Sequence, residues 1–411
     1  MEKTILIAMN LIPIHVRHFA CPGRNAGDNA LIDGLIHSFA FMPNIRFRTM
    51  NLRRTVFTRD FIQQLNRNAD MVLIGGGGLL HAPMSIRKKT DNTSGTLIEL
   101  SKENMDRFTV PLVIYGVGFN VFPGEKTLPD IARDALLKLI EVSDVFTVRN
   151  DGSKKRLMEY LGCEIPKVKS IPDPGLYVNS IESDLSNNVT SEINVAIQIA
   201  ADRLEYRFKN SEMIDAFVNG LCEIINKHSD ITFWLVPHVK KDAEFIKKRM
   251  TKNRANIVPL LSKTKKDACK IMGFYKKMTL VAGQRGHAII CPFGLGVPVI
   301  SLVSHDKNKE FMKEVGFPEF AIDVNNSNFV DLFSNLLEKV ISNNSEIRVK
   351  QNQELSALAK QTQEINKNIV SLAQKNIKHR LTSCCRRGKL NISNMLYGLS
   401  KSKRKALKRG Y

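Results

Sequence analysis

The chain has 411 residues, of which 43% are hydrophobic and 25% charged, so it is a globular protein too long for one ordinary hydrophobic core. Its formal net charge of +21 indicates an anionic partner, which is a nucleic acid, an acidic membrane face or a phosphorylated substrate. Its seven cysteines form no CxxC pair and no cluster with zinc-ligand spacing, which argues against a disulfide framework or a zinc site and favours a reducing compartment.

The first half of the chain alternates short apolar runs with longer helical patterns. Helices are predicted over residues 29–41 and 128–142, and strands at Thr4–Leu11, Met71–Ile74, Leu112–Tyr115 and Val145–Val148. The apolar start is interpreted as a strand and not as a signal peptide, because Asn10 and Pro13 break it and no small-residue cleavage site follows. No run approaches the about 20 apolar residues that a membrane-spanning helix needs.

A polar segment rich in Ser and Asn, residues 179–192, is predicted to link this half to a second one. Beyond it we predict a helix over residues 211–227 and strands at Ile193–Ile199, Ile231–Val236, Met278–Val281 and Val297–Leu302. Nearly all-apolar strands are typical of parallel sheets covered on both faces, and strand–helix alternation implies right-handed βαβ units. The pattern therefore predicts two doubly wound α/β domains, residues 1–180 and 190–345, with the ligand in the crevice between them.

Two further segments follow the second domain. Residues 346–377, rich in Gln, Asn and Lys, predict a closing helix that packs back on the body. Residues 378–411 hold eleven Lys and Arg and no Asp or Glu, and they predict a basic tail. Each basic residue near an anionic membrane contributes about 1 kcal/mol, so peripheral attachment at the inner face is the preferred interpretation, with a solvated tail as the alternative. Nucleic-acid binding is not expected, because no aromatic platform or known motif accompanies the charge.

Glycine-rich turns mark the ends of the strands in the first half. In NAGDNALIDGL, residues 25–35, Gly27 frees the backbone, Asp28 or Asn29 can cap a helix, and the helix start can bind an anion, although a capped helix without a ligand is the alternative. In VLIGGGGLLH, residues 72–81, four glycines follow an apolar strand, namely Gly75, Gly76, Gly77 and Gly78. They match neither a Walker A motif nor GxGxxG, and they predict a ligand-lining loop. VIYGVGF repeats the pattern with Gly116 and Gly118.

Charged residues follow two further apolar segments of the first half. Arg149 ends a predicted strand, where α/β proteins collect the charges of a binding site, although it can also simply pair with a nearby acid. Asp151 or Ser153 can then cap the next helix. Asp173 lies between two prolines in a rigid extended segment, so a structural role and a catalytic role both remain open for it.

The segment LVAGQRGHAIICPFGLGVPVISLVSHDKNK, residues 280–309, carries the most chemical information. Arg285 and His287 follow one predicted strand and Lys307 follows the next, so adjacent parallel strands bring all three to one rim. Two cations beside an imidazole form a pocket for a dianion. The imidazole is then able to exchange a proton with that anion.

Seven segments, taken in order, resemble the polysaccharide pyruvyl transferases: NAGDNALI, LIGGGGLL, YGVGF, TVRNDGS, IPDPGLYV, GQRGHAII and GVPVISLVSHDK. The resemblance runs from about residue 3 to about residue 340, and the RxH pair with a Lys twenty residues after the His carries most weight. The chain departs from the family at two places. An Asp or another polar residue is usual around the site of His81, and an Asp usually follows the Arg at 149, where Asn150 here comes before Asp151.

The resemblance implies a GT-B-like pair of Rossmann-type domains, with the acceptor on the first domain and the donor on the second. It implies transfer of a pyruvyl group from phosphoenolpyruvate to two hydroxyls of a sugar, as a ketal, on a lipid-linked glycan precursor in the cytoplasm. Phosphoenolpyruvate is the co-substrate, and no cofactor or metal is expected. The resemblance further implies that His287 is the general acid and that the donor is bound by Arg285, Lys307 and Arg149.

The remaining candidates are residues that bind the acceptor or line the loops, namely Gly27, Asp28, Asn29, Gly75, Gly76, Gly77, Gly78, His81, Gly116, Gly118 and Asp173. Two other functions stay open from the residues alone. One is a GT-B glycosyltransferase that uses a nucleotide sugar. It would need an acidic or aromatic residue in the second half to bind the nucleotide, and the sequence offers no clear candidate, although Glu310 is able to serve. The other is a basic binding protein without catalytic activity.

Overall fold

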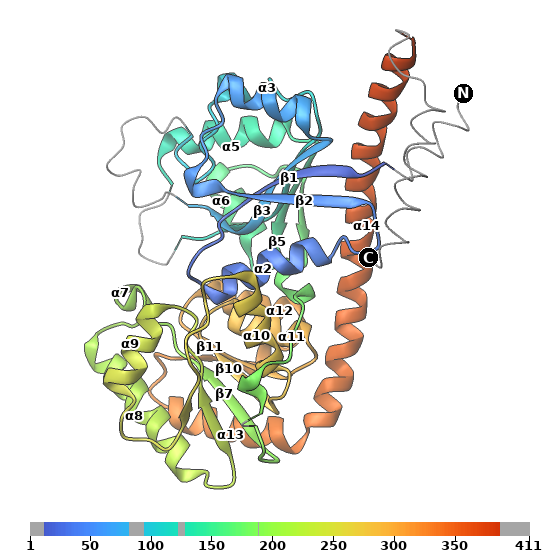
Figure 1. Ribbon diagram of the computed structural model, residues 1–411. Helices are drawn as coiled ribbons and strands as arrows, with labels where there is room; N and C mark the ends of the chain where they lie inside the picture. The colour runs from blue at the N-terminus through green and yellow to red at the C-terminus, as the bar shows by residue number, and fades with distance from the viewer. Residues whose placement is uncertain (1–11, 82–93, 122–127, 188, 387–411) are drawn as a thin grey trace, which may run out of the picture.

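The first half of the molecule is built on a six-stranded parallel sheet (Figure 1). The computed structural model describes residues 12–81, 94–121, 128–187 and 189–386. The sheet has the order β2-β1-β3-β4-β5-β6, with β1 Ile14–Ala20, β2 Ile45–Asn51, β3 Met71–Leu80, β4 Leu112–Phe119, β5 Val145–Arg149 and β6 Val168–Ile171. The helices of this half are α2 Ala26–His37, α3 Arg59–Asn68, α4 Lys102–Met105, α5 Asp130–Val142 and α6 Ser153–Leu161, with the short 3₁₀ helices η1 Leu52–Arg54 and η3 Pro174–Tyr177.

A second six-stranded parallel sheet follows a connection that contains only the 3₁₀ turn η4, Asp184–Ser186, among its described residues. Its order is β12-β11-β10-β7-β8-β9, with β7 Asn194–Gln198, β8 Thr232–Leu235, β9 Asn256–Ile257, β10 Leu280–Gly283, β11 Val299–Val303 and β12 Ala321–Asp323. Its helices are α7 Leu204–Arg207, α8 Ser211–Lys227, α9 Lys240–Arg249, α10 Lys265–Tyr275, α11 His287–Gly294, α12 Asp306–Glu314 and α13 Phe329–Ser342, with η5 Pro318–Phe320. The expected pair of doubly wound α/β units is therefore present.

Most predicted strands coincide with observed ones, but the start of the chain differs. The predicted strand Thr4–Leu11 lies outside the described residues, and the first described strand, β1, was not predicted. Neither was β2, its neighbour at the edge of the sheet. In β1 and β2, His and Arg side chains interrupt the apolar runs on which the prediction relied.

The prediction of a glycine loop after residue 74 was wrong. Strand β3 continues through all four glycines to Leu80, because Gly75 and Gly77 pair with Tyr115 and Val117 of β4 in parallel register. The register shifts after Gly77, which has a φ of 114°, a value that side chains rarely adopt. The glycines therefore let a paired strand, and not a free loop, bend at its carboxyl end.

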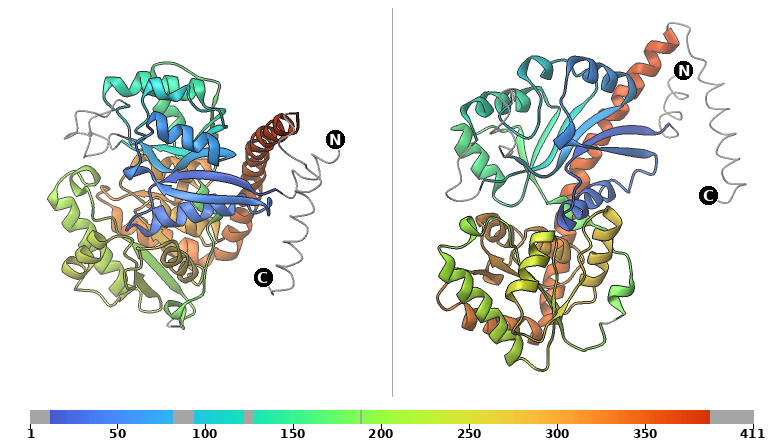
Figure 2. Two further views of the ribbon diagram at one scale, coloured as in Figure 1. Left: turned by 45° about the horizontal axis from the view of Figure 1, so that its top comes forward. Right: turned by 60° about the vertical axis from the view of Figure 1, so that its left-hand side comes forward.

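Helix α2 belongs to the first half by sequence but packs against the second half, as the right-hand view of Figure 2 shows. It contacts η3, α10 and α11, and its Ala30 is part of the same hydrophobic core as the strands of the second sheet. Gly34 allows the close contact with η3, since a Cβ atom there would collide with the backbone oxygen of Pro174. Helix α2 therefore joins the packing of the two halves.

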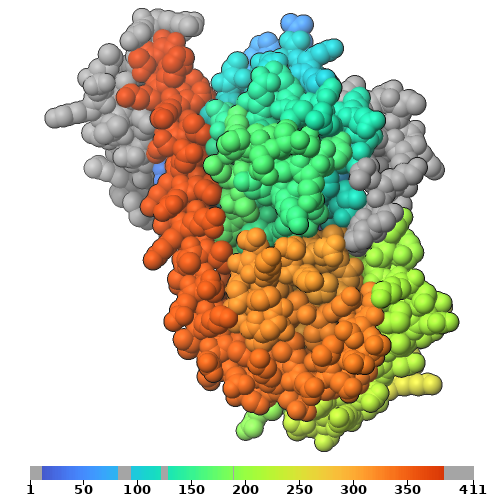
Figure 3. Space-filling model, turned by 180° about the vertical axis from the view of Figure 1, so that it is seen from behind, coloured from blue at the N-terminus to red at the C-terminus, as the bar shows by residue number. Residues whose placement is uncertain are grey.

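Helix α14, Asn344–Arg386, runs along both halves (Figure 3). Its Ile369 and Ala373 belong to the same buried hydrophobic cluster as Val113 of the first sheet, and Asn366 accepts a hydrogen bond from the Tyr115 hydroxyl at 2.7 Å. The helix is longer than the predicted 346–377, and residues 378–386 of the predicted tail continue it. No Gly or Pro occurs between the start of α14 at Asn344 and residue 388, which explains the extension. Residues 387–411 of the tail lie outside the described part.

Within the described ranges, no helix combines the length and the apolar composition that crossing a lipid bilayer requires, and this includes the 43-residue α14.

Candidate active site

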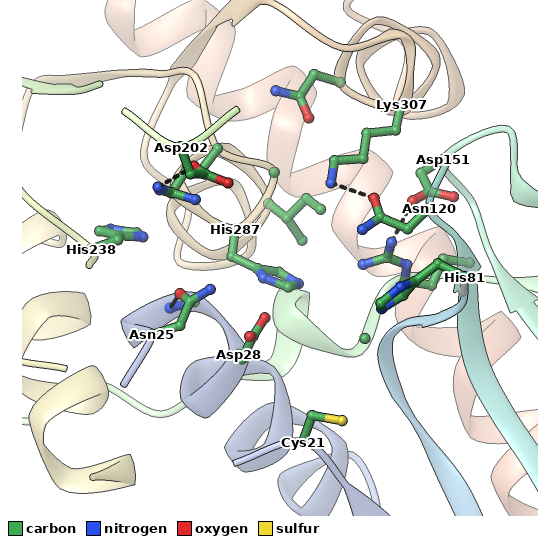
Figure 4. A pocket seen from close by; sticks show the side chains of 18 of the residues that line it. Cys21, Asn25, Asp28, His81, Asn120, Asp151, Asp202, His238, His287 and Lys307 are labelled. Carbon is green, nitrogen blue, oxygen red and sulfur yellow. Dashed lines mark hydrogen bonds and ion pairs between the residues drawn. The ribbon is translucent and has the colours of Figure 1, made fainter. Parts of the chain in front are cut away.

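A cavity of about 410 Å³ lies where the carboxyl ends of the two sheets face each other (Figure 4). The structure brings together ten of the predicted site residues in its lining, namely Gly27, Asp28, Gly76, Gly77, Gly78, His81, Arg149, Arg285, His287 and Lys307. The first turns of α2, α11 and α12 all contribute to this lining. Free N–H groups and positive dipole ends of helices favour an anion in such a place.

His287 is the first residue of α11, and its imidazole points into the middle of the cavity (Figure 4). Its Nε2 atom lies 3.8 Å from Oδ1 of Asp173, too far for a hydrogen bond, and this buried nitrogen has no hydrogen-bond partner among the described residues. Burial alone would raise the pKa of the Asp173 carboxyl, but the Arg149 guanidinium and the His287 imidazole outweigh it and lower this pKa to about 2. Asp173 is therefore a fixed negative charge behind the imidazole.

Arg149, the last residue of β5, connects this carboxylate to a second one. Its guanidinium is 3.1 Å from Asp173 and 2.8 Å from Asp151, and all three side chains are buried. Burial disfavours the charge of Arg149, but the two carboxylates raise its pKa above the ordinary value. Gly118 is needed for this arrangement, because a Cβ atom there would collide with the guanidinium.

Arg285 is held by two carboxylates of the second half. Its Nε and Nη2 atoms donate to both oxygens of Asp242, at 2.8 and 2.6 Å, and Nη2 is also 2.5 Å from Asp202. Burial opposes the charge on Arg285, but Asp242 and Asp202 together raise its pKa. The bidentate contact with Asp242 fixes the plane of the guanidinium.

Lys307, in the first turn of α12, reaches across to the first half. Its Nζ donates to Oδ1 of Asn120, which follows β4, at 3.0 Å. Burial lowers the pKa of Lys307, and the charges of Arg149 and Arg207 lower it further, to about 7. Lys307 therefore gains or loses its proton near neutral pH, and an anion in the cavity would favour the charged form.

The start of α2 forms the opposite wall. Asn25 caps this helix by accepting from the Gly27 backbone N–H at 2.9 Å, so the expectation that Asp28 or Asn29 caps it was wrong. Gly27 lets the helix approach His287, since an added Cβ would lie 2.8 Å from Cβ of His287. Among the described residues the Asp28 carboxylate has no hydrogen-bond or ion-pair partner, and it lies beside His287 in the cavity (Figure 4).

Five predicted residues do not line the cavity. Asp173 lies behind His287, and Gly118 lies against Arg149, so each contacts a residue that lines the cavity without lining it itself. Asn29 donates to the backbone oxygens of Gly23 and Ser262 and joins the two halves. The other two have backbone contacts within the first sheet, where the oxygen of Gly75 bonds to the His18 ring and the N–H of Gly116 donates to Thr147.

No group of three or more His, Cys, Asp or Glu side chains in the described ranges is arranged to hold a metal ion. The cavity chemistry is instead that of arginine, lysine and imidazole groups balanced by aspartates, which suits a small, strongly anionic ligand and proton transfer to it.

A model of the polysaccharide pyruvyl transferase family matches residues 25–306 of this chain. The protein belongs to this family. It is therefore an enzyme that transfers pyruvyl groups in polysaccharide biosynthesis. The match begins at the cap of α2 and includes the cavity residues described above, except Lys307, which is the first residue after it. No curated protein sequence matches the chain significantly.

The fold of this pyruvyl transferase resembles that of nucleotide-sugar enzymes. UDP-GlcNAc 2-epimerase from Neisseria meningitidis bound to UDP-GlcNAc is similar over 87% of this chain and 100% of that chain, with a TM-score of 0.53 and 11% identity. Another UDP-N-acetylglucosamine 2-epimerase is similar over 83% of this chain and 91% of that chain, with a TM-score of 0.50 and 10% identity. At such identities the likeness shows the fold alone, which is the expected GT-B-like pair of Rossmann-type domains.

Sequence reasoning missed several residues of the pyruvyl transferase cavity. Asp202 follows the end of β7, just as Arg149 ends β5, so the same search for charges after strands would have found it. Asp242 gave no such signal, because it lies inside α9 and meets Arg285 only in the folded chain. Asn120 and Arg207 are likewise recognised only from the contacts that the fold creates.

Proposed function

We propose that this enzyme takes its pyruvyl group from phosphoenolpyruvate and places it as a ketal on two hydroxyls of a sugar, with release of phosphate. The observation that carries the proposal is the arrangement of His287 in the middle of a cavity lined by Arg149, Arg285 and Lys307. The donor carries a phosphate and a carboxylate close together. Two or three cations are needed to neutralise such a ligand in a partly buried site.

His287 would act as the general acid. The enol carbon of phosphoenolpyruvate is not electrophilic until its methylene carbon is protonated, so the reaction requires a positioned proton donor. The His287 side chain lines the cavity, and its Nε2 has no hydrogen-bond partner in the described part of the chain. The ionised Asp173, 3.8 Å away, would stabilise the positive charge of the imidazolium.

Asp28 would act as the general base for the acceptor hydroxyl. The other two carboxylates that line the cavity are committed to arginines, Asp151 to Arg149 and Asp202 to Arg285. His238 is a poor base, because burial and the nearby charges lower its pKa to about 3. Asp28 is left as the carboxylate that is both in the cavity and unpaired among the described residues.

These assignments give a balanced reaction. His287 donates a proton to the methylene carbon, the first hydroxyl oxygen bonds to the adjacent enol carbon, and its proton passes to Asp28. The bond from this carbon to the phosphate oxygen then breaks, and Asp28 returns its proton to the departing phosphate. The second hydroxyl bonds to the same carbon, and its proton restores His287. The products are the ketal and hydrogen phosphate, and both residues end as they began.

The two halves of the chain would bind different substrates. Residues 190–345, which supply Arg285, His287 and Lys307, would bind the donor, with Arg149 assisting from the first half. Residues 1–180 would bind the acceptor along the end of β3, where Gly76–Gly78 and His81 line the cavity. A lipid-linked glycan precursor would present its sugar here while the basic tail holds the enzyme at the anionic inner membrane face.

Donor choice tests the proposal directly. Thermal unfolding is measured with phosphoenolpyruvate, UDP-glucose and GDP-mannose, and phosphate release from phosphoenolpyruvate is assayed with a panel of lipid-linked and model glycosides. We expect stabilisation by phosphoenolpyruvate and acceptor-dependent phosphate release. Stabilisation by a nucleotide sugar and not by phosphoenolpyruvate would instead support a glycosyltransferase and contradict the proposal.

A further inference from the structure

The two carboxylates that hold Arg285 differ in how firmly they are themselves held. Asp242 is fully buried. Apart from Arg285, its oxygens accept hydrogen bonds from the Gln198 side chain at 3.2 Å and from the backbone N–H of Ala201 at 3.0 Å. The backbone N–H groups of His238 and Val239 also donate to it, both at 3.2 Å. With five donor groups around it, Asp242 is a fixed partner that orients the guanidinium.

Asp202 is bound much less firmly. Its side chain is 31% exposed and lines the cavity, on the short connection between β7 and α7. Its carboxylate contacts Nη2 of Arg285 at 2.5 Å and Nη2 of Arg207 at 3.4 Å. The next residue, Arg203, has a φ of 53°, in the left-handed region, and no other non-glycine residue in the described part of the chain has a positive φ.

The anionic group on the cavity side of Arg285 is therefore a side chain of the protein itself. A donor anion that binds this guanidinium through both Nη1 and Nη2 has to take the place of Asp202 at Nη2, because Asp242 already occupies Nε and the other side of Nη2 from the buried side. Asp202 is ionised at neutral pH, since Arg285 and Arg207 outweigh the effect of burial and lower its pKa to about 2. It therefore competes with an incoming anion at full charge.

We propose that Asp202 is a displaceable internal counter-ion, which occupies Arg285 in the empty enzyme and gives way to an anionic group of the donor. The proposal deepens the proposed function and rests on a small anionic donor binding in the same cavity. In this role Asp202 determines specificity. A ligand that reaches only Arg285 merely exchanges one ion pair for another, whereas a ligand that also reaches Lys307 or Arg149 gains further ion pairs and displaces it.

The contacts of Arg207 make the test practicable. When the Asp202 carboxylate is removed, Arg207 still donates from Nε to the backbone oxygen of residue 202 at 2.8 Å and from Nη1 to the Ser304 hydroxyl at 3.0 Å. Arg285 likewise keeps its bidentate contact with Asp242. Asp202→Asn and Asp202→Ala are therefore expected to fold, which a thermal unfolding curve of each variant checks.

The probe is inorganic phosphate, titrated calorimetrically into the full chain at fixed ionic strength. We expect Asp202→Asn and Asp202→Ala to bind it about tenfold more tightly than the unaltered enzyme, because a like charge beside the anion is gone. The matched control is Asp215→Asn. It removes the same charge from an ion pair between Asp215 and Arg249 on the surface of the same half. It should leave phosphate affinity within about twofold, as expected for an exposed charge.

Two results would overturn the proposal. One is a phosphate affinity that is unchanged, weakened or undetectable in both Asp202 variants, which would mean that Asp202 only supports the loop. The other is a gain that persists when Arg285→Gln is added to Asp202→Asn, because Asp202 would then act through some other group. Phosphoenolpyruvate is titrated in parallel. If phosphate binding tightens through Arg285 while phosphoenolpyruvate does not bind at all, the displaceable counter-ion stands and the proposed donor fails.

Discussion

The Nε2 atom of His287 lies 3.8 Å from Oδ1 of Asp173, so a fully buried carboxylate faces the imidazole that points into the cavity. The two residues come from different halves of the chain. Asp173 precedes η3, next to the first sheet, and His287 opens α11 of the second half. The contact therefore forms only when the two halves are packed together.

The first prediction concerns Asp173. Asp173→Asn should lower kcat by about a hundredfold or more, because the neutral amide no longer stabilises the imidazolium. It should also lower the free energy of unfolding by about 3 kcal/mol, because Arg149 loses a buried ionic partner. Turnover and urea denaturation measure the two effects. If His287→Asn and the double variant lose no more activity than Asp173→Asn, the residues act as one unit, whereas additive losses would contradict this pairing.

The second prediction concerns the pH dependence of donor binding. Since the pKa of Lys307 is lowered to about 7, the lysine is charged below this pH and neutral above it, so affinity for an anionic donor should fall as pH rises. The dissociation constant for phosphoenolpyruvate should approach about a tenfold increase per pH unit above pH 7.5. The arginine of Lys307→Arg stays charged over this pH range and should flatten this dependence. The ionisation of the ligand itself is the same in the measurements on both proteins. Equal slopes for both proteins would rule out Lys307 as the titrating group.

The third prediction concerns Gly27. In Gly27→Ala the new Cβ would lie 2.8 Å from Cβ and 3.0 Å from Nδ1 of His287, so either the ring or the helix must move. We expect a loss of about 1–3 kcal/mol of stability and a marked fall in kcat. Gly23→Ala is the matched control, because its Cβ would meet only the oxygen of Cys21 at 4.0 Å. Calorimetric unfolding and turnover of the two variants should differ clearly, and similar values would contradict the close approach of α2 to His287.

The fourth prediction concerns Asp28. Asp28→Asn should retain phosphoenolpyruvate binding but lose about a hundredfold or more in phosphate release with an acceptor, because the hydroxyl proton has no acceptor. Asp60→Asn is the control, since Asp60 is also an aspartate in the first turn of a helix, on the exposed side of α3. Formate added to Asp28→Ala should restore part of the rate if the role is that of a base. Retained turnover in Asp28→Asn would transfer this role to another group, with Lys307 the next candidate.

The fifth prediction concerns the basic tail. Because α14 ends at Arg386 and Arg380 bonds to Asp70, deletion of residues 387–411 removes most of the tail charge and leaves these contacts in place. Sedimentation with vesicles containing phosphatidylglycerol should fall by at least about tenfold at physiological salt, since several basic residues are lost. The shortened enzyme should keep its melting temperature. Unchanged sedimentation would show that the tail is merely solvated.

The sequence was sufficient for the fold class because the central strands are nearly all apolar. Strand β4 is buried at every position, and its run of apolar residues predicted it directly. Edge strands follow a different rule, since β2 exposes Arg46 and Arg48 on one side and shows only weak alternation. The glycines of β3 predict a loop when they are taken from the sequence alone, because their pairing with β4 is a property of the folded sheet and not of the local sequence.

The sequence predicted those cavity residues that are charged and lie at or shortly after the end of a strand. Arg149, Arg285 and Lys307 obey this rule, and all three line the cavity. The ion pairs of these residues were not predictable, because Asp242 and Arg285 are far apart in the sequence and meet only through the packing of α9 on the second sheet. The sequence therefore indicates which charges gather in the cavity, whereas only the structure indicates which of them are already neutralised.

Helix α2 contributes its sequence to one half and its packing to the other, and this has a consequence for motion. Swinging the halves apart would pull Ala30 out of a hydrophobic core and break the hydrogen bonds from the Asn29 amide to Ser262 and from the Ala26 N–H to His238. Large hinge movement is therefore costly, and ligands have to enter by shifts of side chains and short connections. A protease cut in residues 179–192 should accordingly yield two fragments that stay associated until denaturant is added.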